Sequence, residues 1–195
     1  MRTVLVMLCG IMLPALAFAQ AWDMRETRTR PLPFLEGVLA GIVAHEIGHG
    51  LVATAKGYDL GVRGLSIVYP DAAMSRSDHL ELASAGIQAQ WLLSEAILRG
   101  YEAHPAEALS QYRAGMVMSH IAITAAYLTF LKDHPDGDLV GMAEATGLST
   151  DTLAAAVLLP AVLDYWRLTG KDVPRWVPAV SAGYKGAGLA VIWAY

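Results

Sequence analysis

The stretch IVAHEIGHGLVATAKG (residues 42–57) places two histidines and a glutamate inside an otherwise apolar run. No Lys or Arg occurs between Pro33 and Lys56, and the apolar segment from Phe34 to Ala55 has about the ~20 residues that a helix needs to cross a bilayer. Ionisable side chains in such a segment are costly and usually serve a function. The stretch therefore predicts a membrane helix that carries a chemical site.

The polar residues of this stretch form an H-E-x-x-H motif, from His45 through Glu46 to His49. On a helix, positions i and i+4 lie on one face, so the two imidazoles are expected to bind one metal ion. Glu46, one residue along, is then placed to act as the general base toward an attacking water. The alternative is that both histidines are hydrogen-bonded core residues that bind no metal.

The composition supports a membrane setting. Hydrophobic residues make up 55% of the 195 residues. Charged residues make up 16%, against roughly 25% in an average soluble domain. The net charge of -4 and the lack of a long basic run give no sign of nucleic-acid binding. The single cysteine, Cys9, lies in the N-terminal segment, so a metal would be held by histidines and carboxylates.

The chain is expected to form one domain behind a targeting segment. Residues 1–19 contain an early Arg, an apolar stretch and a small-x-small end at Ala17-Phe18-Ala19, which indicates a signal peptide or an uncleaved signal anchor. Residues 20–35 are a polar linker, and residues 36–195 are a membrane-embedded metallopeptidase domain. This layout predicts a multi-pass protein of a bacterial inner membrane.

The predicted fold is mainly α, a polytopic bundle of about four spanning helices with a small β-hairpin. The spans are residues 34–55, 114–131, 152–168 and 177–195, and the hairpin falls in residues 58–70. Residues 82–98 carry Gln88, Gln90 and Glu95, so we expect a re-entrant or interfacial helix there. The flanking loops then obey the positive-inside tendency, and the helix of residues 34–55 runs parallel to that of residues 152–168.

A zinc site with an open position needs a third protein ligand. The candidates for this third ligand are Asp78, Glu81, Glu95, His120 and Asp164. His120 and Asp164 are embedded in apolar helices, and Asp164 follows a helix-kinking Pro160 in LLPAVLDYW (158–166). A pairing of Asp164 with Arg167, or a packing role for His120, is the alternative that remains open.

Three segments resemble the site-2 protease family of intramembrane zinc metallopeptidases. They are AHEIGHGLVATAKG (44–57), SAGIQAQWLLSEAIL (84–98) and LLPAVLDYW. The resemblance implies that His45, His49 and Asp164 bind one Zn²⁺ and that Glu46 is catalytic. The chain departs from the family pattern at Tyr165, where the family has Gly, at Gly86-Ile87 in place of Gly-Pro, and in lacking the Asn-x-x-Pro lead.

The expected function is zinc-dependent hydrolysis of a peptide bond within or next to the bilayer. The expected partners are a membrane-protein or peptide substrate and the lipid bilayer, without nucleic acid. Two alternatives stay open: a membrane metal-binding or scaffold protein without proteolytic activity, and an exported soluble zincin that uses Glu81 or Glu95 as third ligand.

Overall fold

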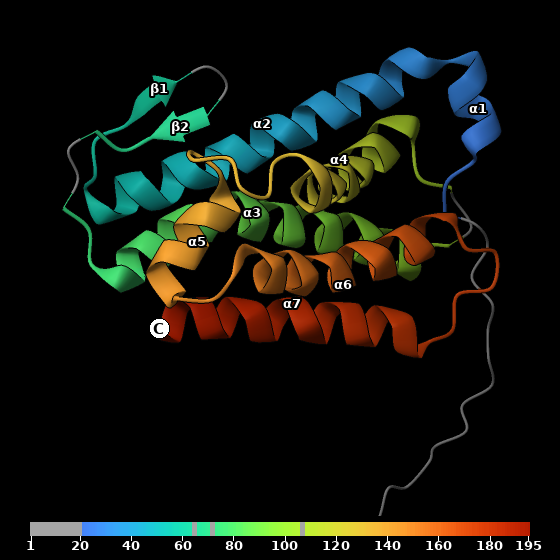
Figure 1. The fold of residues 1–195 in the computed structure, drawn as a ribbon. Helices are drawn as coiled ribbons and strands as arrows, with labels where there is room; N and C mark the ends of the chain where they lie inside the picture. The colour runs from blue at the N-terminus through green and yellow to red at the C-terminus, as the bar shows by residue number, and fades with distance from the viewer. Residues whose placement is uncertain (1–20, 64–65, 71–72, 106–107) are drawn as a thin grey trace, which may run out of the picture.

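The computed structural model describes residues 21–63, 66–70, 73–105 and 108–195. The signal segment predicted for residues 1–19 lies outside the described residues. The described part contains seven helices and one two-stranded sheet (Figure 1). In chain order these are α1 (Met24–Thr29), α2 (Pro31–Lys56), β1 (Gly61–Arg63), β2 (Ser66–Val68), α3 (Arg76–Ala103), α4 (Gln111–Thr129), α5 (Asp138–Thr146), α6 (Thr150–Thr169) and α7 (Trp176–Ala194).

The long helices form a bundle, with α1 at one end and the hairpin and α5 at the other (Figure 1). Helix α2 packs against α3 and α4, and α6 packs against α4 and α7. One core cluster joins α3, α5, α6 and α7 through buried residues that include Trp91, Leu139, Val157 and Ile192. The mainly helical class predicted from the sequence is confirmed. So is the hairpin, whose strands pair antiparallel with Val62 opposite Ile67.

Local signals explain where the helices start and stop. Pro31 stands at the first position of α2, where its missing N–H costs nothing. Gly57 ends this helix with a left-handed φ of 76°, which favours glycine. Helices α3, α4 and α6 each begin with a serine whose hydroxyl accepts a backbone N–H three residues on, at Ser75, Ser110 and Ser149.

All four predicted spans are helices, namely α2, α4, α6 and α7. Among the described residues, one helix is long and apolar enough to cross a membrane by itself, and that is α2. A second candidate exists only if α5 and α6, which bend by 118° at their junction, count as a single span. A bundle of about four spans therefore remains a proposal.

The re-entrant path predicted for residues 82–98 is wrong, whereas their interfacial placement stays a prediction. Residues 82–98 lie within α3, an unbroken helix of 28 residues that packs against α2, α4, α5 and α7. Gln88 is hydrogen-bonded inside the bundle. The Gln88 amide donates to the Ser84 hydroxyl at 2.8 Å and accepts from the Trp193 indole at 2.8 Å. Gln90 is buried by the neighbouring helices as well, and its Nε2 has no hydrogen-bond partner among the described residues.

A continuous α3 reverses the predicted relation between α2 and α6. Helix α2 runs from the α1 end toward the hairpin, whereas α6 runs back toward the α1 end, so the two are antiparallel (Figure 1). The expectation of parallel helices, which brought Asp164 to the level of the histidines, therefore fails.

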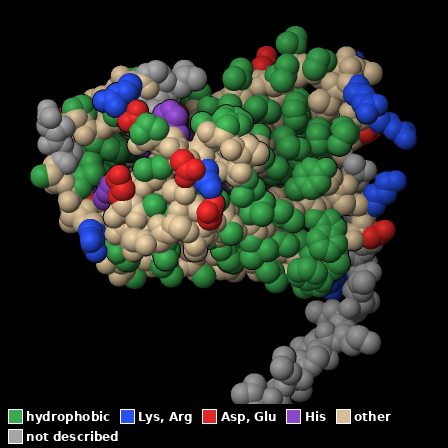
Figure 2. Space-filling view, in the orientation of Figure 1, with side chains coloured by type: hydrophobic (Ala, Val, Ile, Leu, Met, Phe, Trp, Pro, Cys, Tyr) green, Lys and Arg blue, Asp and Glu red, His purple; other side chains and the backbone are tan. Residues whose placement is uncertain are grey.

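The surface carries a large apolar area. Figure 2 shows hydrophobic side chains gathered over the half of the molecule nearer α1, with Lys and Arg at its edge. One face of α2 is an exposed aliphatic stripe, each member of which is more than half exposed. We call this the α2 stripe: Leu32, Leu35, Leu39, Val43, Ile47 and Leu51. The opposite face of α2 is buried and holds His45 and His49.

Candidate metal centre

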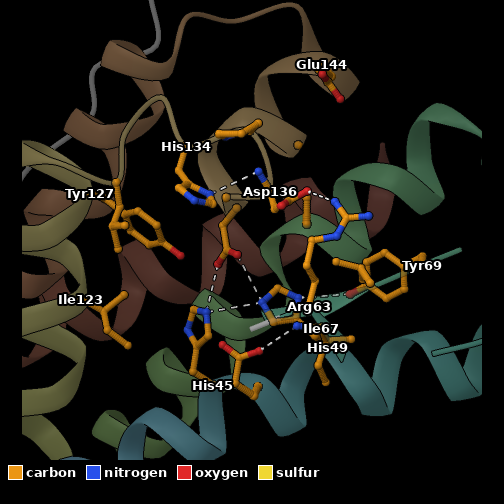
Figure 3. Close-up of a pocket in the computed structure, with 18 of the residues that line it drawn as sticks. His45, His49, Arg63, Ile67, Tyr69, Ile123, Tyr127, His134, Asp136 and Glu144 are labelled. Carbon is orange, nitrogen blue, oxygen red and sulfur yellow. Dashed lines mark hydrogen bonds and ion pairs between the residues drawn. The ribbon is translucent and has the colours of Figure 1, made fainter. Parts of the chain in front are cut away.

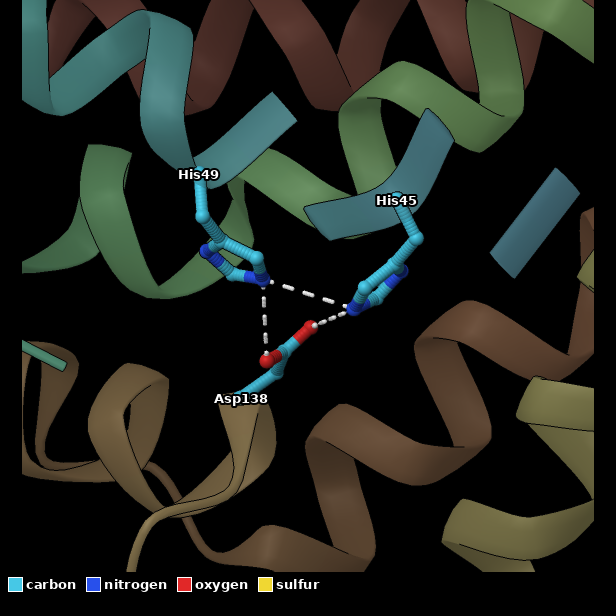
Figure 4. Close-up of side chains that lie close together, drawn as sticks. All are labelled: His45, His49 and Asp138. Atoms are coloured by element: carbon cyan, nitrogen blue, oxygen red, sulfur yellow. Dashed lines mark hydrogen bonds and ion pairs between the residues drawn. The ribbon is translucent and has the colours of Figure 1, made fainter. Parts of the chain in front are cut away.

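Three side chains from two helices meet at the hairpin end of the bundle. His45 and His49 come from α2, and Asp138 is the first residue of α5 (Figure 4). The Nε2 atoms of the two histidines are 3.4 Å apart. Asp138 lies between them, with Oδ2 3.2 Å from His45 Nε2 and Oδ1 3.3 Å from His49 Nε2. Each histidine nitrogen thus faces a different oxygen of the same carboxylate.

His49 is held in a defined tautomer. Its Nδ1 lies 2.8 Å from the carbonyl oxygen of Leu82 on α3. Because a carbonyl only accepts, Nδ1 carries the hydrogen and Nε2 presents a lone pair toward His45 and Asp138. Metal-binding histidines characteristically donate their other ring N–H to a carbonyl or carboxylate in this way.

His45 lies flat against α3. A Cβ at Gly86 would come within 2.3 Å of the His45 Nε2 atom, so only glycine leaves room for the ring. A Cβ at Gly48 would likewise meet the Ala85 carbonyl at 2.6 Å. These two glycines allow α2 and α3 to approach closely and fix the position of the histidine face.

Asp138 reaches the histidines through the turn that joins α4 to α5. Backbone bonds from His134 to Leu131 and from Gly137 to His134 fold this connection back over the bundle. Helix α5 then begins at Asp138, where the positive end of the helix dipole favours a carboxylate. A Cβ at Gly141 would lie 2.8 Å from that of Ala83, so α5 packs tightly on α3 and holds the carboxylate in place.

Glu46 is half buried beside the triad and is oriented by the hairpin. The backbone N–H of Ile67 in β2 donates to its Oε2 at 3.3 Å. Tyr69, just after β2, places its hydroxyl 3.3 Å from His49 Nδ1. Burial, together with the charges of Asp138 and Glu46, raises the pKa of Tyr69, so its hydroxyl stays protonated. The hairpin therefore supplies the wall that positions the carboxylate.

A pocket of about 570 Å³ opens over these groups (Figure 3). Its floor is formed by the histidines, Glu46 and Asp138, and its walls come from the hairpin, α4, the α4–α5 turn and α5. Apolar walls are provided by Ile42, Ile67, Ile123 and Leu131, among others. The pocket is therefore large enough for several side chains of an extended peptide and is mixed in polarity.

The triad fits zinc in both chemistry and size. Two imidazoles and one carboxylate leave a fourth position open, as in catalytic zinc sites. Bonds of about 2.0–2.1 Å in a tetrahedral arrangement separate neighbouring ligand atoms by about 3.3 Å. The two Nε2 atoms are 3.4 Å apart, and one ligand atom from each of the three residues can be chosen so that all lie within 4.8 Å of one another. Asp138 Oδ2 is buried and accepts no hydrogen bond within the described part of the chain. Among the described residues this is the one group of three that fits a metal ion.

Asp164 does not join the triad. Its Oδ2 accepts from the Lys185 ammonium at 2.6 Å, and its Oδ1 accepts from Ser181 at 2.8 Å and Arg167 at 3.2 Å. The carboxylate is fully buried, and two cations balance its charge. The structure thus places Asp138, not Asp164, beside the histidines. The pairing with Arg167 that the sequence left open is present.

The other candidate third ligands are also engaged elsewhere. Glu81 lies 2.8 Å from the Lys56 ammonium, and Asp78 pairs with the same lysine. Glu95 lies 2.7 Å from Arg167 and 3.0 Å from Lys185. The ligand set expected for a soluble zincin, with Glu81 or Glu95, is therefore not assembled. His120 is buried near Asp164, with 3.8 Å between Nε2 and Oδ2.

Comparison with protein-family models, curated proteins and solved structures finds no match to this chain.

Proposed function

We propose that this chain is a zinc-dependent endopeptidase that hydrolyses a peptide bond within or next to a membrane. The observation that carries the proposal is the meeting of His45 Nε2 and His49 Nε2, 3.4 Å apart, with the Asp138 carboxylate, whose two oxygens lie 3.2 and 3.3 Å from them, beside Glu46. The HEIGH segment that resembles the site-2 protease family supplies three of these four residues. The proposal departs from that family in taking its carboxylate ligand from Asp138.

Each residue of the site has its own role in the proposed reaction. His45, His49 and Asp138 would hold the ion, and bound zinc would supply a Lewis acid that polarises the scissile carbonyl and makes water easier to ionise. Glu46 accepts the proton of the attacking water and then delivers it to the leaving amine. The Ile67 N–H keeps the Glu46 carboxylate oriented while it does so. The apolar walls exclude bulk water and so strengthen these electrostatic effects.

The membrane part of the proposal rests on the α2 stripe. Six large aliphatic residues on one face of a 26-residue helix are exposed, although soluble proteins seldom expose such continuous apolar surface. The same helix is the one that satisfies the length and composition of a span among the described residues. We propose that this face contacts lipid, while the opposite face presents the zinc ligands to the bundle interior.

The test is cleavage of an apolar polypeptide by the detergent-purified chain, with Glu46→Gln as the key variant. We expect a loss of roughly 10²–10⁴ in rate, the usual contribution of a general base, while the metal content stays unchanged. Glu36→Gln is the matched control, because Glu36 lies exposed on the same helix. Cleavage by Glu46→Gln at the wild-type rate would exclude the mechanism. Metal binding without any Glu46-dependent cleavage would favour a metal-binding protein without proteolytic activity.

A further inference from the structure

A buried polar cluster lies next to the metal centre, and the proposed mechanism does not use it. It contains His120 on α4, Asp164 and Arg167 on α6, and Ser181 and Lys185 on α7. All five residues are at least 96% buried. Burying so many polar groups in an otherwise apolar bundle is costly, so a role for the cluster is expected.

The packing of α2 on α4 places His120 opposite His45. A Cβ at Gly37 would lie 2.0 Å from the Tyr112 carbonyl oxygen, and a Cβ at Gly41 would meet the Met116 carbonyl at 3.1 Å. Moving four residues along α2, from Gly37 to Gly41, moves the contact four residues along α4, from Tyr112 to Met116. The two helices therefore run parallel. The next step of four residues brings His45 opposite His120.

Each of these histidines has one buried nitrogen without a hydrogen-bond partner among the described residues. These atoms are Nδ1 of His45 and Nε2 of His120. Nε2 of His45 faces His49 and Asp138, so Nδ1 is the nitrogen that points away from the metal position (Figure 4). An unsatisfied buried polar atom costs about 1–3 kcal/mol, whereas a bridging water with two or more polar partners removes that cost.

The contrast with His49 defines what His45 lacks. His49 donates its Nδ1 hydrogen to the Leu82 carbonyl, but His45 Nδ1 has no hydrogen-bond partner in the part of the chain that the structure describes. The distance between His120 Nε2 and Asp164 Oδ2 is 3.8 Å, which is too long for a direct hydrogen bond. A water molecule between these two atoms would have an acceptor on each side.

We propose that His120 is a positioning residue for His45, acting through one bridging water. His45 Nδ1 donates to the water, and the water donates to His120 Nε2 and Asp164 Oδ2. Lys185, Arg167 and Ser181 hold the Asp164 carboxylate in place. The inference rests on the proposed zinc site and adds an outer layer to it. Asp164 then serves the metal without touching it.

Cobalt(II) binding to the full chain in detergent tests this role, because Co²⁺ reports both affinity and ligand geometry through its visible absorption. His120→Phe fills the same space without a polar atom. We expect its Co²⁺ dissociation constant to rise about 10–100-fold, as for other outer partners of metal-binding histidines, with a shifted absorption band. His120→Gln, whose amide can still accept from the water, should retain most of the affinity. His104→Phe, an exposed histidine at the end of α3, is the control.

A purely structural role would lower the unfolding temperature of the apo protein but leave the cobalt band unchanged. Wild-type affinity and band shape in His120→Phe would overturn the proposal and leave the zinc site intact. If His120→Phe fails to fold, His120→Asn takes its place, because its shorter amide cannot reach the water and should behave like Phe. Equal binding by His120→Asn and wild type would refute the role. A wild-type chain that binds no cobalt would instead refute the proposed function itself.

Discussion

At the scale of single residues, Asp164 is surrounded by a buried network of charged side chains. Lys185 is 3% exposed and contacts Asp164, Ser94 and Glu95. Lys185→Met keeps the volume but leaves a buried carboxylate with one cation fewer. We expect a loss of about 3–5 kcal/mol in the free energy of unfolding, as when one partner of a buried ion pair is removed, measured by denaturant titration in detergent.

The matched control uses another cation that contacts the same glutamate. The Arg99 side chain is 66% exposed and pairs with Glu95 at 2.8 Å. Exposed pairs contribute about 0–1 kcal/mol, so Arg99→Met should change stability little. Equal effects of the two substitutions would contradict the account of the network.

The same residues show what sequence reasoning can and cannot reach. His45, Glu46 and His49 are predicted because their relation is local and helical geometry fixes it. Asp164 is predicted to bind zinc, whereas the structure pairs it with Arg167, the alternative that the sequence left open, and with Lys185, 21 residues away on α7. Asp138 belongs to the acidic connection KDHPDGD, where nothing separates a ligand from an ordinary acidic helix start. Only the packing of α5 on α3 distinguishes it.

At the scale of helices, α3 is the element on which the site is built. It provides the Leu82 carbonyl to His49 and the glycine surface under His45. Its helical nature follows from the sequence, but its course does not. The predicted re-entrant path assumed that Gln88 and Gln90 would have to avoid lipid, whereas both are buried by neighbouring helices.

Gly86→Ala tests this role of α3. A Cβ there would lie 2.3 Å from the His45 ring, so the ring must shift relative to His49 and Asp138. We expect at least a tenfold weaker zinc affinity, since small displacements of ligands are costly in metal sites, measured by competition with a chelating indicator. Gly100→Ala on the same helix is the control, because a Cβ there meets nothing within 4 Å. Unchanged affinity in Gly86→Ala would show that His45 is not held against α3.

At the scale of the whole molecule, the apolar surface decides where the protein resides. A charged residue in the middle of a lipid-facing helix costs about 2.5–3.5 kcal/mol for insertion. Leu39→Asp, in the α2 stripe, should therefore move part of the protein out of the carbonate-resistant membrane fraction. Leu60→Asp is the control, because Leu60 is exposed but lies beyond α2. Complete extraction of the wild type by carbonate without detergent would refute the membrane location.

The central claim is that His45, His49 and Asp138 bind one zinc ion. The most direct measurement is the zinc content of the purified full chain, at a free zinc concentration that saturates a site weakened a hundredfold. Wild type, Glu46→Gln and Asp164→Asn should each hold close to one zinc per chain, whereas His45→Ala and Asp138→Asn should hold little. Full zinc in Asp138→Asn together with its loss in Asp164→Asn would contradict the account.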